Sequence, residues 1–256
     1  MIGAIAGDIS GSVYERTPIK SKDFPFFCEH SRYTDDTVLT VAVADAILNN
    51  GDYVSFLKNY ARRYPDAGYG YSFYSWMMSD ENGPYNSWGN GSAMRVSPVG
   101  FAFDTEVEVL SEAKRSAAVT HNHPEGIKGA QAVALSIYMA RIGEGRTVIR
   151  DEVARRFGYD LNRSLSSIRP GYEFDVSCGG SVPESIISFI ESEDYEDSVR
   201  NAISLGGDSD TMACISGGIA QAYYGDVPDV IKEGATERIP PEFIAVINRF
   251  DKSFLS

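Results

Sequence analysis

The chain carries, at residues 34–51, the stretch TDDTVLTVAVADAILNNG, in which a short acidic cluster is followed at once by a run with helical spacing. The apolar positions of this run fall on one helix face, at Val38, Leu39, Ala42, Val43, Ala46 and Ile47. Asn49-Asn50-Gly51 is typical of a helix end. Unpaired backbone N–H groups and the positive end of the dipole favour carboxylates at a helix start. We therefore expect Asp35 and Asp36 to lie at the N-terminus of a helix.

The same arrangement returns near the other end of the chain. Residues 206–211 read GGDSDT and precede a predicted helix over Met212 to Tyr224. This helix contains Gly217-Gly218, and each Gly costs about 1 kcal/mol relative to Ala in a helix interior. We expect a neighbouring helix to approach closely there in compensation.

Helical periodicity also dominates elsewhere. Further predicted helices are Ala130 to Arg141, Val148 to Phe157, Ser181 to Ile190 with a capping box and Pro183 in its first turn, and a segment from Asp194 to Leu205. Few stretches alternate with period two, and no βαβ rhythm is visible. Residues 65–98 lack periodicity and are predicted to be a functional loop. The sequence thus predicts an all-α fold, with residues 1–256 forming one domain.

Composition and charge narrow the possible classes of protein. With 43% hydrophobic residues over 256 positions, the chain can bury a substantial core. A net charge of -13 argues against binding duplex nucleic acid, which needs a dense Lys/Arg surface. The cysteines Cys28, Cys178 and Cys214 form no C-x-x-C pair and indicate reduced thiols. No basic leader and no apolar run of about 20 residues is found, so we expect a cytoplasmic protein without membrane contact.

The two acidic clusters together suggest a metal site. Each offers only oxygen ligands, and this set suits a hard cation such as Mg²⁺ or Mn²⁺ rather than zinc. The candidate ligands are Thr34, Asp35, Asp36, Asp208, Asp210 and Thr211. For one cluster alone, a helix cap would be the simpler interpretation. The repetition of Thr with two Asp at two helix starts favours a metal.

Other acidic motifs fit this chain less well. A D-D-x-x-D motif would need Asp in place of Leu39, and an EF-hand loop would need a Gly and a distal Glu after Asp208. The phosphatase motif D-x-D-x-T lacks its spacer, since Thr211 directly follows Asp210. A phosphohydrolase with Asp208 as nucleophile stays open as an alternative.

Five motifs in order resemble the ADP-ribosylglycohydrolase family, which includes the dinitrogenase-reductase-activating glycohydrolases and the ADP-ribosyl-acceptor hydrolases. They are Gly3-Ala4-Ile5-Ala6-Gly7-Asp8 running to Glu15, Tyr33-Thr34-Asp35-Asp36-Thr37, Trp88-Gly89-Asn90-Gly91-Ser92-Ala93-Met94-Arg95, Thr120-His121 with Glu125-Gly126, and Leu205-Gly206-Gly207-Asp208-Ser209-Asp210-Thr211. The resemblance covers nearly the whole chain. It implies a compact orthogonal helical bundle whose cleft holds a binuclear centre of two Mg²⁺ or Mn²⁺ ions, ligated by the six residues of the acidic clusters.

The resemblance also implies the activity. The ions would hold the distal ribose of ADP-ribose, and the bond at its anomeric carbon would be hydrolysed, releasing ADP-ribose from a protein or small molecule. Glu15 occupies the position of a family glutamate over the cleft, and we assign catalytic roles to Glu15 and Asp36. Asp8 is expected to cap or support the loop.

Contacts with the nucleotide are expected from a glycine-rich segment. Glycines let backbone N–H groups approach a diphosphate, and Trp88 offers a face for stacking; an ordinary turn with one buried Trp is the other interpretation. The candidate residues are Ser87, Trp88, Gly89, Asn90, Gly91 and Met94, joined by His121 through the resemblance. Arg95 is expected to contact phosphate or an acidic neighbour.

Some properties stay open at this level. The acceptor could be arginine, serine, a nucleic-acid base or the acetyl ester of ADP-ribose. The preference between Mg²⁺ and Mn²⁺ and the role of His123 are undetermined, and a monomer is expected. A binding protein without catalytic activity is the remaining alternative, against which the intact ligand set and Glu15 argue.

Overall fold

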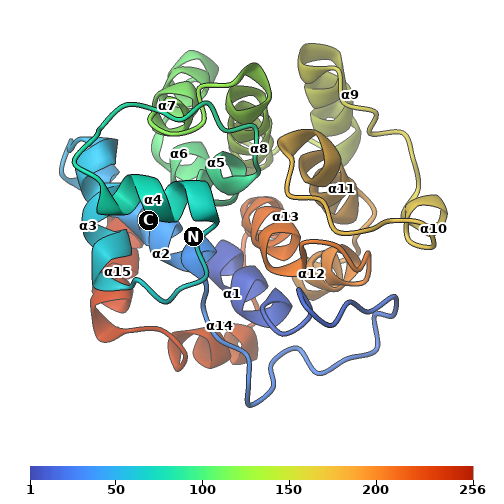
Figure 1. The fold of residues 1–256 in the computed structure, drawn as a ribbon. Helices are drawn as coiled ribbons and strands as arrows, with labels where there is room; N and C mark the ends of the chain where they lie inside the picture. The colour runs from blue at the N-terminus through green and yellow to red at the C-terminus, as the bar shows by residue number, and fades with distance from the viewer. Residues whose placement is uncertain (256) are drawn as a thin grey trace.

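The computed structural model describes residues 1–255, and these residues form fifteen helices and no β-strand (Figure 1). The helices are α1 (Ile2–Gly11), α2 (Asp35–Leu48), α3 (Tyr53–Arg63), α4 (Tyr71–Met78), α5 (Gly91–Met94), α6 (Ser97–Ala102), α7 (Glu106–Ala118), α8 (Pro124–Arg141), α9 (Arg146–Phe157), α10 (Leu165–Ile168), α11 (Cys178–Ile190), α12 (Tyr195–Ile203), α13 (Ser209–Tyr224), α14 (Asp229–Thr236) and α15 (Pro241–Phe254). The predicted all-α fold is confirmed. No helix within this range is long and apolar enough to cross a membrane.

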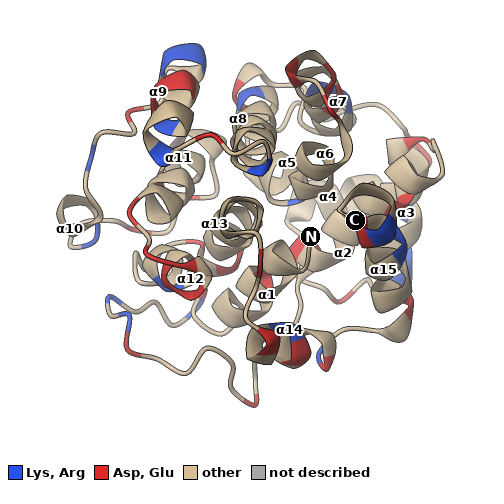
Figure 2. Ribbon diagram, turned by 180° about the vertical axis from the view of Figure 1, so that it is seen from behind, with Lys and Arg blue, Asp and Glu red and all other residues tan. Residues whose placement is uncertain are grey.

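Helix α13 lies at the centre of the molecule, where it packs against α1, α8, α11 and α12 (Figure 1). All of its residues from Ser209 to Ala220 are buried. Figure 2 shows the consequence for charge, since α13 is almost wholly tan while the outer helices α9 and α12 carry acidic and basic residues. The second acidic cluster therefore begins a helix that is enclosed by the rest of the fold.

Glycines bring α1 and α13 into close contact. A Cβ added to Gly217 would lie 2.5 Å from the carbonyl oxygen of Gly3, and one added to Gly7 would lie 2.1 Å from that of Ala213. At the end of α1, Gly11 meets the backbone of Asp210 in the same way. The close approach expected at Gly217 is confirmed, and its partner is α1. This contact fixes the acidic start of α13 against the end of α1.

We predict that Gly7→Ala destabilises the protein. The added methyl group has no space against the backbone of Ala213, and overpacking of this kind costs about 1–3 kcal/mol or more. Gly171→Ala is the matched control, because a Cβ there meets nothing within 4 Å. The free energy of unfolding from urea titration measures both. Equal stability of the two variants would contradict the tight α1–α13 contact.

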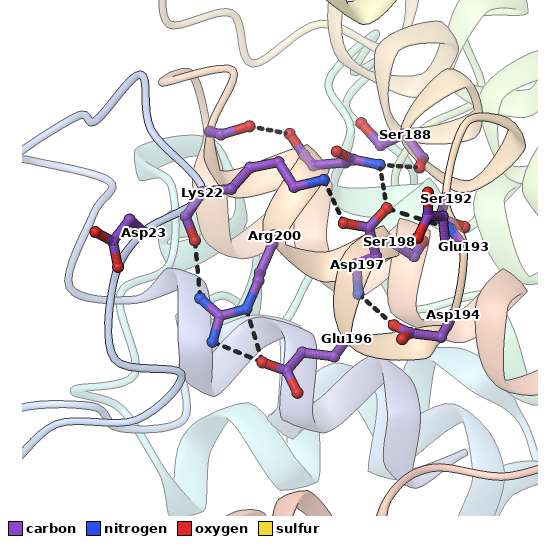
Figure 3. Close-up of polar contacts among 12 residues, drawn as sticks. Lys22, Asp23, Ser188, Ser192, Glu193, Asp194, Glu196, Asp197, Ser198 and Arg200 are labelled. Atoms are coloured by element: carbon purple, nitrogen blue, oxygen red, sulfur yellow. Dashed lines mark hydrogen bonds and ion pairs between the residues drawn. The ribbon is translucent and has the colours of Figure 1, made fainter.

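The segment between α1 and α2, which carries Glu15, is bound to α12 by hydrogen bonds and an ion pair. Arg200 donates to the carbonyl oxygens of Lys22 at 3.0 Å and Phe24 at 2.6 Å. Figure 3 shows the Arg200 side chain between Lys22 and Glu196, with the Lys22 ammonium paired to Asp197. These contacts hold Lys22 and Phe24 against α12. Glu15, earlier in the same segment, lies at the mouth of the cleft described below.

Two local predictions were wrong. Helix α11 begins at Cys178 rather than at Ser181, because Ser177 caps it by accepting from the Gly180 N–H at 2.9 Å. Pro183 consequently lies inside the helix. Residues 65–98 are also not structureless, since they contain α4 and α5 and the start of α6. Helix α4 forms there because it buries Phe73, Trp76 and Met77 against the core.

Candidate metal centre and ligand cleft

A cleft of about 530 Å³ opens between the starts of α2 and α13. Every residue predicted for the site from the sequence lines it: Glu15, Thr34, Asp35, Asp36, Ser87, Trp88, Gly89, Asn90, Gly91, Met94, His121, Asp208, Asp210 and Thr211. These residues come from widely separated parts of the chain. The fold therefore brings the two acidic clusters and the glycine-rich segment to one place, and their individual roles stay predictions.

Asp8 on α1 holds the first acidic cluster in position. Its carboxylate accepts from the N–H and hydroxyl of Thr34, at 3.0 and 2.6 Å, and from the N–H and hydroxyl of Thr37. Thr34 in turn caps α2 by accepting from the Asp36 N–H. Burial raises the pKa of Asp8 to about 6, against the opposing effect of these four hydrogen bonds. Asp8 thus supports the loop as expected, and it leaves Asp35 and Asp36 free to face the cleft.

The second acidic cluster is fixed from two sides. Ser209 Oγ donates to the carbonyl oxygen of Gly11 at 2.9 Å, and Asn90 Nδ2 donates to Asp208 Oδ2 at 2.7 Å. The turn before the cluster uses Gly206 at φ 68°, a left-handed conformation that favours glycine. One side of the cluster therefore contacts the end of α1, and the other contacts the Ser87–Gly91 segment.

The two clusters meet at the floor of the cleft. Thr211 Oγ1 donates to Asp36 Oδ1 at 3.4 Å across them. Burial, followed by the charge of Asp210, raises the pKa of Asp36 well above the carboxyl range. Burial likewise raises the pKa of Asp35 to about 8 and that of Asp210 well above normal. Buried carboxylates gathered in this way are unfavourable without a compensating cation.

The donor chemistry of the floor fits a hard divalent ion. Asp36 Oδ2 is buried and has no hydrogen-bond partner, which leaves one carboxylate oxygen available for coordination. Within residues 1–255, however, no group of three or more His, Cys, Asp or Glu side chains is arranged closely enough to form a ready metal cage.

We predict that divalent ions stabilise the protein. An ion that binds the folded state alone, at one hundred times its dissociation constant, adds about 2.7 kcal/mol to the unfolding free energy. Thermal unfolding with MgCl₂ or MnCl₂, compared with EDTA, measures the shift, and KCl at equal ionic strength is the control. An unchanged midpoint with both ions would count against a metal centre at Asp36 and Asp210.

Glu15 lies half-buried at the mouth of this cleft, on the segment that leaves α1. Its carboxylate is close enough to contribute to the raised pKa of Asp35, Asp208 and Asp210. It therefore faces both acidic clusters. The basic side chains of Arg16 and Arg32 also line the mouth.

The Ser87–Gly91 segment forms the opposite wall and is tied to residues 176–178. The Asn90 N–H donates to the Val176 carbonyl oxygen at 2.8 Å, and the Cys178 N–H donates to that of Trp88 at 3.1 Å. The Gly89 N–H donates to Ser87 Oγ, so two of the N–H groups expected to face phosphate already have partners. Trp88 is 51% exposed rather than buried, which leaves its ring face available for stacking.

His121 lies under this segment and His123 has a structural position. His123 Nδ1 accepts from the Glu125 N–H at 3.1 Å and so caps α8, a role that the sequence left undetermined. Arg95 is fully buried and forms no ion pair with any residue that the structure describes; its Nη2 donates to Thr120 Oγ1 at 2.7 Å and to the Ser116 carbonyl oxygen at 3.3 Å. Arg95 does not pair with an acidic neighbour among residues 1–255, and it lines the cleft with Nε and Nη1 unpartnered, so the expected contact with phosphate stays a prediction.

Sequence reasoning missed an apolar rim around the cleft. Phe174, Val176, Tyr71 and Tyr85 line it, and the first three are largely exposed. Residues 174–176 lie between α10 and α11 and belong to no local motif. They reach the cleft through the pairing of Gly89 with Ser177, a long-range contact that no spacing in the sequence indicates.

Comparisons with known proteins match nearly the whole chain. Residues 1–252 match the family model described as ADP-ribosylglycohydrolase. ADP-ribosylhydrolase ARH3 of Gallus gallus is 28% identical, with 95% of this chain and 86% of that protein covered. ARH3 of Homo sapiens is 25% identical, covering 88% and 84%. The putative ADP-ribosyl glycohydrolase L543 of Acanthamoeba polyphaga mimivirus is 24% identical, covering 90% and 87%.

A solved structure shares the fold. A chain described as an ADP-ribosylglycohydrolase-related protein complex superposes with a TM-score of 0.72 at 24% identity, covering 98% of this chain and 96% of that one. At this level of identity the likeness concerns the arrangement of helices, and it agrees with the all-α prediction.

Proposed function

The chain belongs to the ADP-ribosylglycohydrolase family of hydrolases, and on this premise we propose that it cleaves, with divalent metal ions, the bond at the anomeric carbon of an ADP-ribosylated acceptor. The observation that carries the proposal is the meeting of two oxygen-only clusters at the floor of one cleft, with Asp36 Oδ2 buried and unpartnered. The products are free ADP-ribose and the unmodified acceptor.

The residues of the two clusters would hold two Mg²⁺ or Mn²⁺ ions. Thr34, Asp35 and Asp36 approach from α2, and Asp208, Asp210 and Thr211 approach from α13. When bound, the ions orient the ribose hydroxyls and lower the pKa of water. Asp8 and Asn90 keep the carboxylates aimed at the cleft through the hydrogen bonds described above.

Glu15 and Asp36 are the proposed catalytic carboxylates. Glu15 faces the clusters from the mouth of the cleft, where a carboxylate can take a proton from the attacking water or give one to the departing acceptor. Asp36 lies at the floor, where its charge stabilises the positive charge that develops on the ribose in an oxocarbenium-like transition state.

The nucleotide would lie along the opposite wall. The exposed ring of Trp88 and the neighbouring Phe174 offer faces on which an adenine can stack. His121 lies below Gly89 and Gly91, within reach of a diphosphate that crosses this segment. This placement puts the distal ribose over the acidic clusters and the acceptor near Glu15.

One experiment tests the proposal. The protein is incubated with arginine-linked, serine-linked and O-acetyl ADP-ribose, in Mg²⁺, in Mn²⁺ and in EDTA, and free ADP-ribose is detected by mass spectrometry. We expect release from at least one substrate with metal, and its loss in EDTA. If no substrate is cleaved with either ion, the proposal fails.

The alternative of a phosphohydrolase that uses Asp208 as nucleophile has less support. Burial raises the pKa of Asp208, and its Oδ2 already accepts from Asn90. The raised pKa lowers the fraction of Asp208 that is ionised, and the hydrogen bond occupies one of its carboxylate oxygens. Trapping of a beryllium-fluoride adduct on Asp208, with turnover of simple phosphate esters, would favour this alternative.

We also propose that residues 1–256 act as one domain, as a cytoplasmic monomer. A single cluster of buried apolar side chains runs from Met1 to Phe250, and all three cysteines are free. Light scattering of the purified protein tests the oligomeric state, with a mass near 28.0 kDa expected.

A further inference from the structure

His121 presents one ring nitrogen to the cleft and the other to the protein interior. Its Nε2 lies 3.1 Å from the position that a Cβ on Gly91 would take, and 3.8 Å from that on Gly89. Within residues 1–255 this nitrogen has no hydrogen-bond partner. The whole residue is only 4% exposed. Nε2 is therefore the atom of His121 that a ligand on the Ser87–Gly91 segment can reach.

The interior nitrogen is part of a chain of hydrogen bonds. Nδ1 lies 2.7 Å from Thr120 Oγ1, and the same oxygen accepts from Arg95 Nη2 at 2.7 Å. A guanidinium can only donate, and a threonine hydroxyl has one hydrogen to give. The direction of the Arg95–Thr120 bond is therefore fixed, and the hydroxyl hydrogen of Thr120 is left for Nδ1.

We propose that Arg95 and Thr120 are positioning residues that hold His121 as its neutral Nε2–H tautomer, so that Nε2–H donates a hydrogen bond to an anionic oxygen of the ligand. This inference rests on the proposed function only for the identity of the ligand, ADP-ribose. The chain Arg95–Thr120–His121 itself is a property of the protein alone.

The electrostatics of the buried guanidinium favour this tautomer. Arg95 is fully buried without a carboxylate partner, and its Nε and Nη1 make no hydrogen bond. Its charge acts on the Nδ1 side of His121, where a lone pair is favoured over an N–H. Burial, and then this charge, hold the pKa of His121 well below its usual range, so the ring stays neutral.

The opposite tautomer would need another acceptor. If Nδ1–H donated to Thr120, the hydroxyl hydrogen of Thr120 would have to turn toward Tyr85, whose hydroxyl is nearby. Burial raises the pKa of Tyr85 to about 12, against the charge of Arg95 and the hydrogen bond from Thr120, so this phenol keeps its proton and offers Thr120 only a neutral oxygen as acceptor. An imidazole nitrogen is a stronger acceptor than a neutral phenol oxygen, which favours the Thr120 hydrogen on Nδ1 and the lone pair at that nitrogen.

The direct readout is the ¹⁵N spectrum of the ligand-free protein labelled at its three histidines. We expect a pyrrole-type Nε2 and a pyridine-type Nδ1 for His121 that do not titrate between pH 5 and 8. His121→Asn removes these signals and so assigns them. A pyridine-type Nε2, or a ring that becomes charged in this range, would overturn the proposal.

Paired variants test the consequence for binding. Thr120→Val removes the hydroxyl at nearly constant shape, and we expect its ¹⁵N spectrum to show loss of the single tautomer and its affinity for ADP-ribose in Mg²⁺ to fall about 10- to 100-fold. Thr120→Ser should restore the single tautomer and the affinity for ADP-ribose. His121→Gln, whose amide can replace Nε2–H, should bind more tightly than His121→Asn.

The outcomes separate this inference from the proposed function. A wild-type protein with the expected spectrum that does not bind ADP-ribose contradicts the function and leaves the tautomer established. Tight binding of ADP-ribose by Thr120→Val, with an unchanged spectrum, overturns the positioning role of Thr120. If Thr120→Val does not fold, the inference is still tested by the wild-type ¹⁵N spectrum and by whether His121→Gln binds ADP-ribose more tightly than His121→Asn.

Discussion

Asp36→Asn should abolish release of ADP-ribose while leaving the metal-free protein at least as stable as the wild type. The substitution keeps the size of a side chain that is 2% exposed and replaces an ionisable carboxyl group, one oxygen of which has no partner in the protein, with a neutral amide. Loss of a group that both binds metal and stabilises the transition state costs several kcal/mol, which corresponds to about 10³-fold or more in rate.

The expected gain in metal-free stability has a defined pH dependence. The folded protein holds the pKa of Asp36 well above its usual range, so at neutral pH this buried carboxyl lowers stability relative to the unfolded chain, where it is ionised. Asparagine removes that penalty, and its advantage should disappear as the pH falls below the ordinary carboxyl pKa of about 4. Thermal unfolding of Asp36→Asn and of the wild type, in EDTA at several pH values, measures this difference in stability.

Asp45→Asn on the same helix is the matched control. Asp45 accepts from the Tyr60 hydroxyl at 2.9 Å, away from the cleft. The Asp45→Asn substitution should lower the free energy of unfolding and leave the rate of ADP-ribose release unchanged. An Asp36→Asn variant with wild-type activity would remove Asp36 from the site.

Glu15→Gln should reduce the rate of hydrolysis and spare binding. A positioned general acid or base contributes about 10²- to 10⁴-fold, and Glu15 faces the acidic clusters from the mouth of the cleft without being enclosed by them. We expect kcat to fall by that factor, with the affinity for ADP-ribose and for Mn²⁺ changed by a few-fold at most. Steady-state kinetics and calorimetry provide the two measurements.

Glu29→Gln, a substitution of an exposed glutamate on the same segment between α1 and α2, is the control for Glu15. It should leave kcat and affinity unchanged. If Glu15→Gln instead lost affinity for the metal with little change in kcat, Glu15 would be a ligand-holding residue rather than a catalytic one.

The sequence predicted the starts of α2 and α13 because their signals are local. In each, Thr and Asp side chains stand beside an apolar run of helical period, and the N-cap at Thr34 depends only on residues within the next turn. Helix α1 gave no such signal. All of its residues are buried, so it has no polar face, and its glycines are explained only by the backbone of α13.

Other features depend on contacts between distant segments. Phe174 and Val176 reach the cleft only because residues 176–178 bond to the Ser87–Gly91 segment. The sequence also could not show that Asn90 fixes Asp208, or that Arg95 bonds to Thr120. Glu15 and His121 were identified by family resemblance, since an isolated Glu or His carries no local mark of its role.

The central claim is that the two acidic clusters share two divalent ions. Anomalous diffraction from crystals soaked in MnCl₂ with ADP-ribose tests it most directly. We predict two manganese peaks, both between Thr34-Asp35-Asp36 and Asp208–Thr211, with the distal ribose beside them, and loss of at least one peak in Asp36→Asn. Absence of manganese between these clusters, in crystals that show bound ADP-ribose, would contradict the account.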